Sequence, residues 1–294
     1  MGVLFQILVN IFLSAFLYML IATSFFLIYN TVKFFHLAQA SVISFGAYAT
    51  FFFENRLLVP FSVAVLLAII FSTSIGAICE IIIYRPMRDR NMPALKYLIA
   101  SIGLYVIFLN LISLYFGDDS KVIDNSQAIA GHEIFGAYIT TNQIIILFTS
   151  LVLTVAITLI LKYSRIGKSI RGVANNPELC NIYGINSNHV ILIAFCIGSA
   201  LGAIAGILSA MDSNITPNFG FNLLLYGVVV MIIGGLGSTK GLVLASFLIA
   251  ATQHLAAFFI DTKWMDAITY CILILFLIWK PLGFSGQKLK KVEI

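Results

Sequence analysis

The chain has 294 residues, of which 61% are hydrophobic and 10% charged, and its mean hydropathy is +1.03. An ordinary soluble domain carries about 25% charged residues, so this composition excludes a soluble globular protein. The apolar runs reach the length of a helix that crosses a bilayer, which excludes a barrel of short alternating strands. The net charge of +5 is not evidence for nucleic-acid binding, because the cations lie in the loops that flank the apolar runs, and we expect no nucleic-acid partner. We therefore expect an all-α, polytopic protein embedded in a lipid bilayer.

About nine apolar segments follow one another along the chain, and eight to ten spans are compatible with them because two segments are irregular. The segment at 34–53 begins with polar side chains, and the segment at 221–238 ends in a glycine-rich run. Glycine clusters loosen a helix at a membrane boundary, so these segments are either broken or re-entrant, or they end in a tight turn. The first segment is too long for a signal-peptide core and lacks a basic start, so it is expected to remain as a span. The segments are 5–29, 34–53, 57–83, 94–116, 143–161, 190–210, 221–238, 241–260 and 265–280.

Lysine and arginine residues predict the orientation of the chain, since cytoplasmic loops carry an excess of them. Most of the 17 cations fall on one side of the bilayer if Lys33, the loops at 84–97 and 162–189, Lys240 and the C-terminal tail share it. That side is predicted to be cytoplasmic, which places the N-terminus outside and the C-terminus in the cytoplasm. The polar loop at 117–142 is then extracytoplasmic, and its sequence is compatible with a small cap or with strands.

The loop at 162–189 is built like a docking element. Asn176 can cap the free N–H groups of a helix, Pro177 suits the first turn, and Glu178 favours the positive end of the helix dipole. Cations precede this start, an apolar stripe with i, i+3, i+4 spacing follows it, and a glycine stands where a left-handed stop favours one. These residues are Arg165, Lys168 and Arg171, then Leu179, Ile182 and Tyr183, and then Gly184. We predict a helix of about two turns on which another protein acts.

The sequence contains no motif for catalysis or nucleotide binding. In the run at 234–241 the lysine is followed by Gly241 rather than by Ser or Thr, so the run is not a phosphate-binding loop, and its glycine spacing is not that of a dinucleotide-binding loop. The four histidines form no pair with the spacing of metal ligands, and the four cysteines contain no CxxC pair. We therefore expect neither an enzyme, nor a metal site, nor a cofactor bound by this chain.

The apolar segments also lack the ionisable groups at mid-membrane that ion-coupled carriers need. Glu80 lies near the cytoplasmic end of its segment, close to Arg85, and is expected to form an ion pair at the interface. If the chain moves a solute uphill, the energy is then expected to enter from outside the bilayer, through the 162–189 loop.

Two further sets of residues within the apolar segments are candidates for a role. Glycines recurring every four residues let a neighbouring helix approach closely, either as static packing or as a sliding contact beside the 162–189 loop. Polar residues near the start of the second segment either face a solute path or form hydrogen bonds between helices. The two sets are Gly198, Gly202 and Gly206, and His36, Gln39, Ser41 and Ser44.

Four stretches carry a resemblance to a known family, at 84–110, 163–208, 234–241 and 280–286. The chain resembles the permeases of branched-chain amino acid ABC importers, from about residue 12 to 286. The resemblance implies a single transmembrane permease domain over 1–294 and two cytoplasmic ATPase subunits that bind ATP and magnesium. It also implies an extracytoplasmic solute-binding protein and a second homologous permease chain, with a heterodimer favoured over a homodimer. By position, the helix at Pro177 to Tyr183 would be the coupling helix on which an ATPase docks.

The chain departs from the family where its second apolar segment begins. Family members usually have Asn-Phe-Ala-His-Gly-Glu there, whereas this chain has His36 to Ser41, with Gln39 in place of a histidine. We predict a multi-pass permease subunit of the inner membrane that imports branched-chain or other apolar amino acids by alternating access. The alternatives are an ABC permease for urea or short amides, an ATP-independent facilitator or channel, and a membrane scaffold without transport.

Overall fold

A computed structural model of the chain describes residues 2–123, 131–134, 137–235 and 238–284. The described residues are helical apart from one short hairpin and the connecting loops. The helices are α1 (Gly2–Val32), α2 (Gln39–Asn55), α3 (Phe61–Cys79), a π-helical turn (Glu80–Tyr84), α4 (Arg85–Asp89), α5 (Ala94–Phe116), α6 (Thr141–Tyr163), α7 (Arg165–Asn175), α8 (Pro177–Ile182), α9 (Ser187–Ala210), α10 (Phe219–Gly234), α11 (Thr239–Phe259), a 3₁₀ turn (Thr262–Trp264) and α12 (Met265–Trp279).

Each of the nine expected apolar segments coincides with a helix, but fewer of these helices have the length and apolarity of a membrane span. Among the described residues, seven helices meet both conditions. Helix α2 has 17 residues and α10 has 16, which is short for the roughly 20 residues that a bilayer core requires. The all-helical membrane architecture is thus confirmed with seven membrane-capable helices rather than nine. These seven are Val3–Val32, Phe61–Asp89, Ala94–Phe116, Thr141–Tyr163, Ser187–Ala210, Thr239–Phe259 and Thr262–Trp279.

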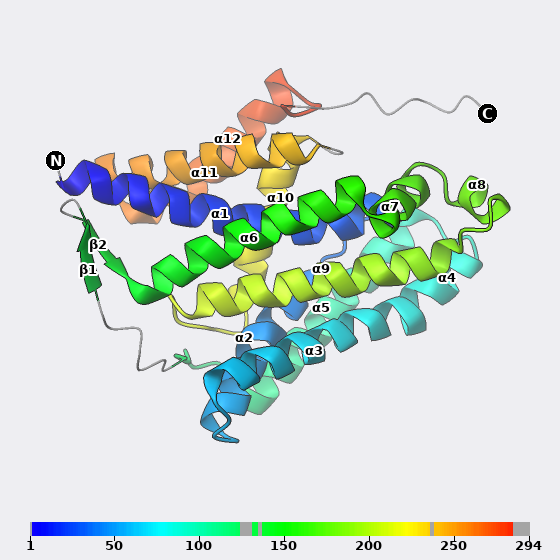
Figure 1. The fold of residues 1–294 in the computed structure, drawn as a ribbon, viewed down its shortest axis with the longest axis horizontal. Coiled ribbons are helices and arrows are strands. Elements are labelled where there is room, and N and C mark those ends of the chain that lie inside the picture. Colours follow the sequence, from blue (N-terminus) through cyan, green and yellow to red (C-terminus); the bar gives the residue numbers. More distant parts are fainter. Residues whose placement is uncertain (1, 124–130, 135–136, 236–237, 285–294) are drawn as a thin grey trace.

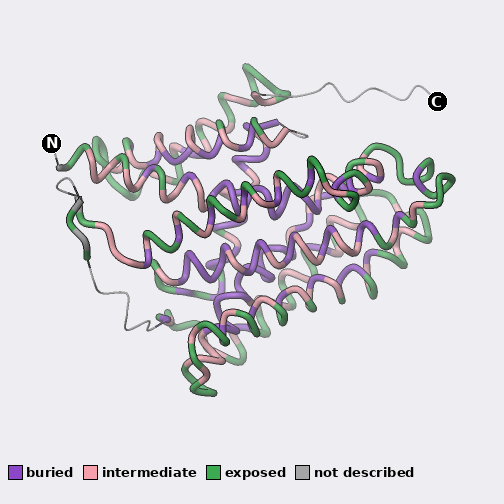
Figure 2. Tube along the Cα trace, viewed as in Figure 1, coloured by how far each residue is buried: buried purple, intermediate pink, exposed green. Residues whose placement is uncertain are grey.

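Helix α1 occupies the centre of the bundle. It packs against α9, α11, α10 and α6, and the long helices α1, α6 and α9 run side by side along the molecule (Figure 1). Buried residues are concentrated on these central helices, whereas the peripheral helices expose much of their surface (Figure 2). Polar side chains of α1 are paired inside the bundle: the Tyr18 hydroxyl donates to Gln253 at 2.7 Å, and the Ser14 hydroxyl lies 2.8 Å from the His254 ring.

The two segments expected to be irregular form continuous helices with unusual boundaries. Helix α2 begins at Gln39 after a non-helical stretch, and α10 ends at Gly234, followed by Gly235 with φ +92°. A Cβ on Gly241 would lie 1.8 Å from the carbonyl oxygen of Gly234. Glycine at this position therefore lets the start of α11 touch the end of α10. Residues 236–237 of the connecting run lie outside the described residues.

The two long polar loops lie at opposite ends of the bundle (Figure 1). The described part of the 117–142 loop contains a hairpin of β1 (Gly131–Ile134) and β2 (Ala137–Thr140) beside the start of α1, where Gln6 accepts a hydrogen bond from the Tyr138 backbone at 2.9 Å. Of the two possibilities for this loop, a small cap or strands, the described residues therefore contain strands. Helices α4, α7 and α8 gather at the other end, so the 162–189 loop is separated from the hairpin by the length of α6 and α9.

Candidate functional site

The helix predicted in the 162–189 loop is present as α8. Asn176 is its N-cap and its side chain accepts a hydrogen bond from the Leu179 backbone at 2.9 Å, while Pro177 and Glu178 occupy the first turn. Gly184 follows with φ +81°, the left-handed conformation that suits glycine after a helix. Local capping therefore defines both ends of this short helix.

The apolar stripe of α8 points away from the rest of the chain. Leu179 is 48% exposed, Ile182 81% and Tyr183 78%. Cys180, between them in sequence, is buried and faces α7. Leu179 and Ile182 on α8 and Tyr183 just after it thus form an exposed apolar surface outside the membrane-capable segments.

Helix α8 is fixed to the start of α9 by side-chain hydrogen bonds. The Ser187 hydroxyl donates to the Pro177 carbonyl at 2.7 Å, and the Ser187 backbone N–H donates to the Asn181 side chain at 2.9 Å. Asn186 caps α9 by accepting from the His189 backbone at 3.1 Å. The two hydrogen bonds of Ser187 thus connect α8 to the first turn of α9.

The basic residues that precede α8 lie on an amphipathic helix of their own, α7, which was not predicted from the sequence. Ser164 caps it, and Gly167, Ile170 and Val173 form its buried face. Gly167 packs against the end of α6, where a Cβ would lie 2.4 Å from the Ile160 carbonyl oxygen. The spacing of Gly167, Ile170 and Val173 is compatible with one buried face of a helix, but the cations between them favour an exposed loop.

The three cations of α7 do not share one environment. Arg165 and Lys168 are exposed. The Arg171 guanidinium instead donates to the carbonyl oxygens of Leu161 and Lys162 at the end of α6. Arg171 therefore caps the C-terminus of α6, where unpaired carbonyls favour a cation.

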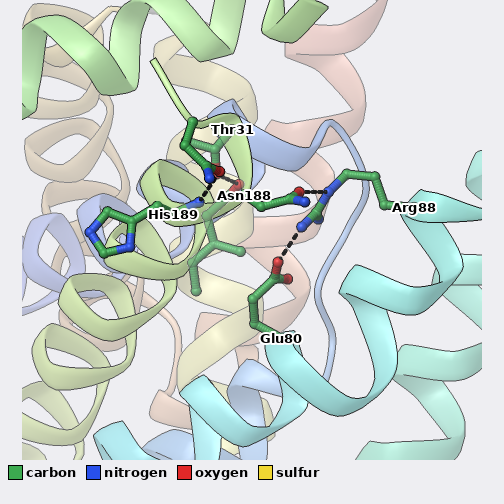
Figure 3. Close-up of polar contacts among 7 residues, drawn as sticks. Thr31, Glu80, Arg88, Asn188 and His189 are labelled. Atoms are coloured by element: carbon green, nitrogen blue, oxygen red, sulfur yellow. Dashed lines mark hydrogen bonds and ion pairs between the residues drawn. The ribbon is translucent and has the colours of Figure 1, made fainter. Parts of the chain in front are cut away.

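An ion pair joins the π-helical turn after α3 to α4, and a hydrogen bond from the same arginine reaches the start of α9 (Figure 3). Arg88 donates to the Glu80 carboxylate at 2.5 Å and to the Asn188 side chain at 3.0 Å. The Glu80 side chain is 1% exposed and that of Arg88 is 25% exposed. The partner of Glu80 is thus Arg88 rather than the expected Arg85, and the link to Asn188 was not predicted.

A cavity of about 600 Å³ lies next to this ion pair and α8. Its walls come from the end of α1, from α4, from α7 and α8, and from the first turns of α9, and they include Lys33, Arg88, Glu178 and Asn188. The cavity thus lies between α4 and the inner side of α8.

The glycine face of α9 contacts α1 and α2. A Cβ on Gly198 would lie 2.7 Å from Ile28 of α1, and a Cβ on Gly206 would lie 2.2 Å from the Ile43 carbonyl oxygen of α2. Gly202 faces the Gln39 side chain in the same way, at 2.5 Å. Gly206 thus allows close contact with the backbone of α2, while Gly198 and Gly202 make room for side chains of α1 and α2.

The four polar residues near the start of α2 are buried and bond to different elements. The Gln39 amide donates to Ser24 of α1 at 2.9 Å and to the Gly198 carbonyl at 3.1 Å. The other three contact, respectively, the π-helical turn, α5 and the segment before α10. These contacts are His36 Nδ1 with Tyr84 Oη at 3.0 Å, Ser41 Oγ with the Tyr105 carbonyl at 3.3 Å, and Ser44 Oγ with the Pro217 carbonyl at 3.4 Å.

Comparison with known proteins shows what the chain is similar to. A family model described as branched-chain amino acid transport system, permease component, matches residues 7–277. The chain is 29% identical to the high-affinity branched-chain amino acid transport system permease protein LivH of Escherichia coli K12, over 92% of this chain and 91% of that protein. It is 29% identical to the permease protein BraD of Pseudomonas aeruginosa, over 92% of both chains. The permease protein LivM of Escherichia coli K12 is 24% identical over 50% of this chain and 35% of that protein. No solved structure matches the chain.

Proposed function

Because the chain belongs to the family of branched-chain amino acid transport system permease components, we propose that it is the membrane-spanning permease subunit of an ATP-driven importer for branched-chain or other apolar amino acids. The observation that carries the proposal is the family match over residues 7–277, which runs from α1 to α12 and includes the whole 162–189 loop. The names of LivH and BraD supply the substrate class. The chain is a transport subunit and not an enzyme.

The proposed assembly contains two cytoplasmic ATPase subunits, an extracytoplasmic solute-binding protein and a second homologous permease chain. LivH and LivM of Escherichia coli are distinct permease proteins of a transport system of the same name, and the chain resembles both. That resemblance favours a heterodimer over a homodimer. The complex is placed in the inner membrane, with the 162–189 loop and the C-terminus in the cytoplasm and the 117–142 loop outside. The distribution of lysine and arginine residues supports this orientation.

In the proposed mechanism, closure of the ATPases moves α8 and thereby the pore helices. The exposed face of Leu179, Ile182 and Tyr183 is the docking surface. The hydrogen bonds of Ser187 transfer the displacement to α9, whose glycine face lies directly on α1 and α2. The Arg88 bridge from Asn188 to Glu80 transfers it in parallel to the end of α3. Alternating access follows if these helices take up two arrangements.

The docking surface is tested in the complete transporter reconstituted in liposomes, by replacing Leu179, Ile182 and Tyr183 together with Asp. Charged residues at the contact should prevent ATPase association, and ATP-driven uptake should fall to background while membrane insertion stays normal. The control replaces Val122 and Tyr138, exposed apolar residues at the other end of the molecule, with Asp and should leave ATPase association unchanged. Uptake unchanged by the triple replacement would refute the docking role of α8.

The solute and the energy source are tested separately. The partner solute-binding protein should bind leucine, isoleucine or valine more tightly than urea or acetamide, and the reverse preference would favour the short-amide alternative. The permease pair alone in liposomes should show no leucine flux without the ATPases. Flux under those conditions would identify an ATP-independent facilitator.

A further inference from the structure

Helix α10 carries a row of polar side chains on an otherwise apolar helix. Asn222 and Tyr226 are its polar residues, and the rest of Phe219–Gly234 is apolar or glycine. Asn218 stands directly before the helix and has a helical backbone, with φ −80° and ψ −4°. The three side chains follow one another at intervals of four residues, so they share one face of the helix. Helix α10 lies between α12 and α2 (Figure 1).

The helices on either side add polar groups to this row. The Tyr105 hydroxyl of α5 donates to the Asn218 side chain at 3.2 Å. At the other end of the row, the Tyr226 hydroxyl donates to the Asp266 carboxylate of α12. The polar stripe defined in this way extends from α5 across α10 to α12. Its members are Tyr105, Asn218, Asn222, Tyr226 and Asp266.

The polar stripe lies on a surface that the described chain leaves uncovered. Asn218, Asn222 and Asp266 are exposed, and α5 and α12 bury few of their residues against the rest of the chain. The Tyr226 ring lies 5.0 Å from the ring of Tyr18, in the middle of the long helix α1. The stripe therefore reaches the depth of the bundle centre. By contrast, the four polar residues near the start of α2 are 0–2% exposed.

The chain does not neutralise the Asp266 carboxylate. Among the residues that the structure describes, the ion pair that forms is the one between Glu80 and Arg88. The helix dipole favours an acid in the first turn of α12, but the dipole does not account for the amides along α10. Hydrocarbon offers no hydrogen-bond partner to amides or to a carboxylate, and ionisable groups in membrane segments face protein or a water-filled path. The polar stripe therefore faces water or protein rather than lipid.

We propose that the polar stripe binds the charged backbone groups of the transported amino acid, with Asp266 receiving the ammonium and the Asn218 and Asn222 amides donating to the carboxylate. Side chains one helical turn apart are separated by about 5–6 Å, which suits two charged groups carried by the same carbon atom. Urea and short amides carry neither charge and would leave Asp266 without a partner. The inference rests on the proposed function, and the second permease chain forms the opposite wall of the path.

Direct binding of leucine tests the site. Radiolabelled leucine is titrated into the complete transporter in detergent micelles, without the solute-binding protein, and the wild type should bind it saturably. Asp266→Asn keeps an acceptor for Tyr226 and should weaken binding about tenfold, the effect of one charge-assisted contact. Asp119→Asn, on an exposed acid of the 117–142 loop, should leave the affinity unchanged. Equal affinities of the wild type and Asp266→Asn, or no saturable binding by the wild type, would overturn the inference.

Two leucine analogues separate the roles of the residues in competition with labelled leucine. Leucine methyl ester keeps the ammonium and lacks the carboxylate, so Asp266→Asn should weaken it about tenfold and Asn222→Leu should leave it unchanged. For 4-methylpentanoate, which keeps the carboxylate and lacks the ammonium, the pattern should be reversed. If each variant weakens both analogues equally, the residues act through the fold and the assignment is wrong. Asn222 lies on the uncovered face, so its replacement is expected to preserve the fold.

Two further measurements separate this inference from its rivals. Native mass spectrometry of the Asp266→Asn complex should still show the permease pair, and loss of the second chain would identify a packing contact in place of a solute site. ATP-driven leucine uptake with the solute-binding protein tests the proposed function independently. Uptake by the wild type that Asp266→Asn leaves unchanged would overturn the solute site alone, whereas no leucine uptake by the wild type would refute the proposed function itself.

Discussion

The buried ion pair between Glu80 and Arg88 offers a direct measure of how the end of α3 is held. Among the residues that the structure describes, Arg88 is the ion-pair partner of the Glu80 carboxylate, which is 1% exposed, and Arg88→Met removes this partner while keeping a side chain of similar length. Removing one member of a buried pair typically costs about 3–5 kcal/mol, because the remaining charge stays buried without compensation. Arg88 reaches partly into solvent, so we expect a loss near 3 kcal/mol in the free energy of unfolding.

Glu80→Gln should cost less than Arg88→Met. The guanidinium left behind keeps Asn188 as an acceptor and is 25% exposed, so it can be hydrated. We expect a loss of about 1–2 kcal/mol for this change. The double variant removes both charges and should be no less stable than Arg88→Met alone. The two losses are therefore non-additive by about 1–2 kcal/mol, as is typical for groups in direct contact.

The assay is unfolding of the purified chain in mixed micelles with a rising fraction of denaturing detergent, measured by circular dichroism. Arg85→Met is the matched control, because Arg85 is exposed on the neighbouring turn and its loss should change stability by less than about 0.5 kcal/mol. If the losses in the double variant simply add, the two side chains act independently, and the Glu80–Arg88 link does not hold α3 in the way we infer.

Three further predictions concern other positions. Gly206→Ala places a Cβ 2.2 Å from the Ile43 carbonyl oxygen, so the helices must separate and unfolding should become easier by about 1–3 kcal/mol, measured in the same micelles. Ser187→Ala removes the 2.7 Å hydrogen bond to Pro177, so leucine uptake per ATP hydrolysed should fall in proteoliposomes while the ATPases stay bound. Asp212, in the turn after α9, has an exposed side chain, but partial burial still raises its pKa above its ordinary value of 3.8, which disfavours the charged form in the folded protein. Asp212→Asn should therefore raise the melting temperature at pH 7, and the gain should shrink as the pH falls towards 3.8.

Each of these changes has a control in the chain. A Cβ on Gly103 meets no other atom within 4 Å, so Gly103→Ala should be neutral or slightly stabilising. An equal loss of stability for both glycine variants would exclude helix contact as the cause. Ser169→Ala removes a hydrogen bond within α7 only. An equal fall in leucine uptake per ATP hydrolysed for this variant would contradict the role of Ser187. Asp119→Asn, on an exposed side chain of the 117–142 loop, should give no pH-dependent gain in stability, and an equal gain would show that the partial burial of Asp212 is not responsible.

The sequence predicts the helical segments well because apolar length is a direct physical signal. Each expected segment contains a helix, and α8 begins where Asn176 and Pro177 indicate. The length of an apolar segment does not tell how much of that segment is helical. Helices α2 and α10 are too short to cross a bilayer core because each has an irregular end. Local patterns thus locate helices more reliably than they count spans.

The contacts within the candidate site are harder to predict from the sequence. Arg85 is five residues beyond Glu80, about 140° around a regular helix, whereas Arg88 reaches back across the π-helical turn. A π-helical turn has no signature in a single sequence. The partners of Gln39 and Ser44 come from α1, α9 and the segment before α10, more than 150 residues away in two cases, and no local pattern encodes such pairing.

The central position of α1 has a consequence for how the protein is made. This helix is made before the other helices described, yet the residues that pair with Tyr18 and Ser14 are Gln253 and His254, which follow 235 and 240 residues later. Until α11 emerges, these hydroxyls of α1 face hydrocarbon, water or an insertion factor instead of their final partners. A ribosome-bound chain stopped before α11 is therefore expected to expose a helix that the finished molecule encloses, which makes the early intermediate a natural substrate for membrane chaperones and quality-control proteases.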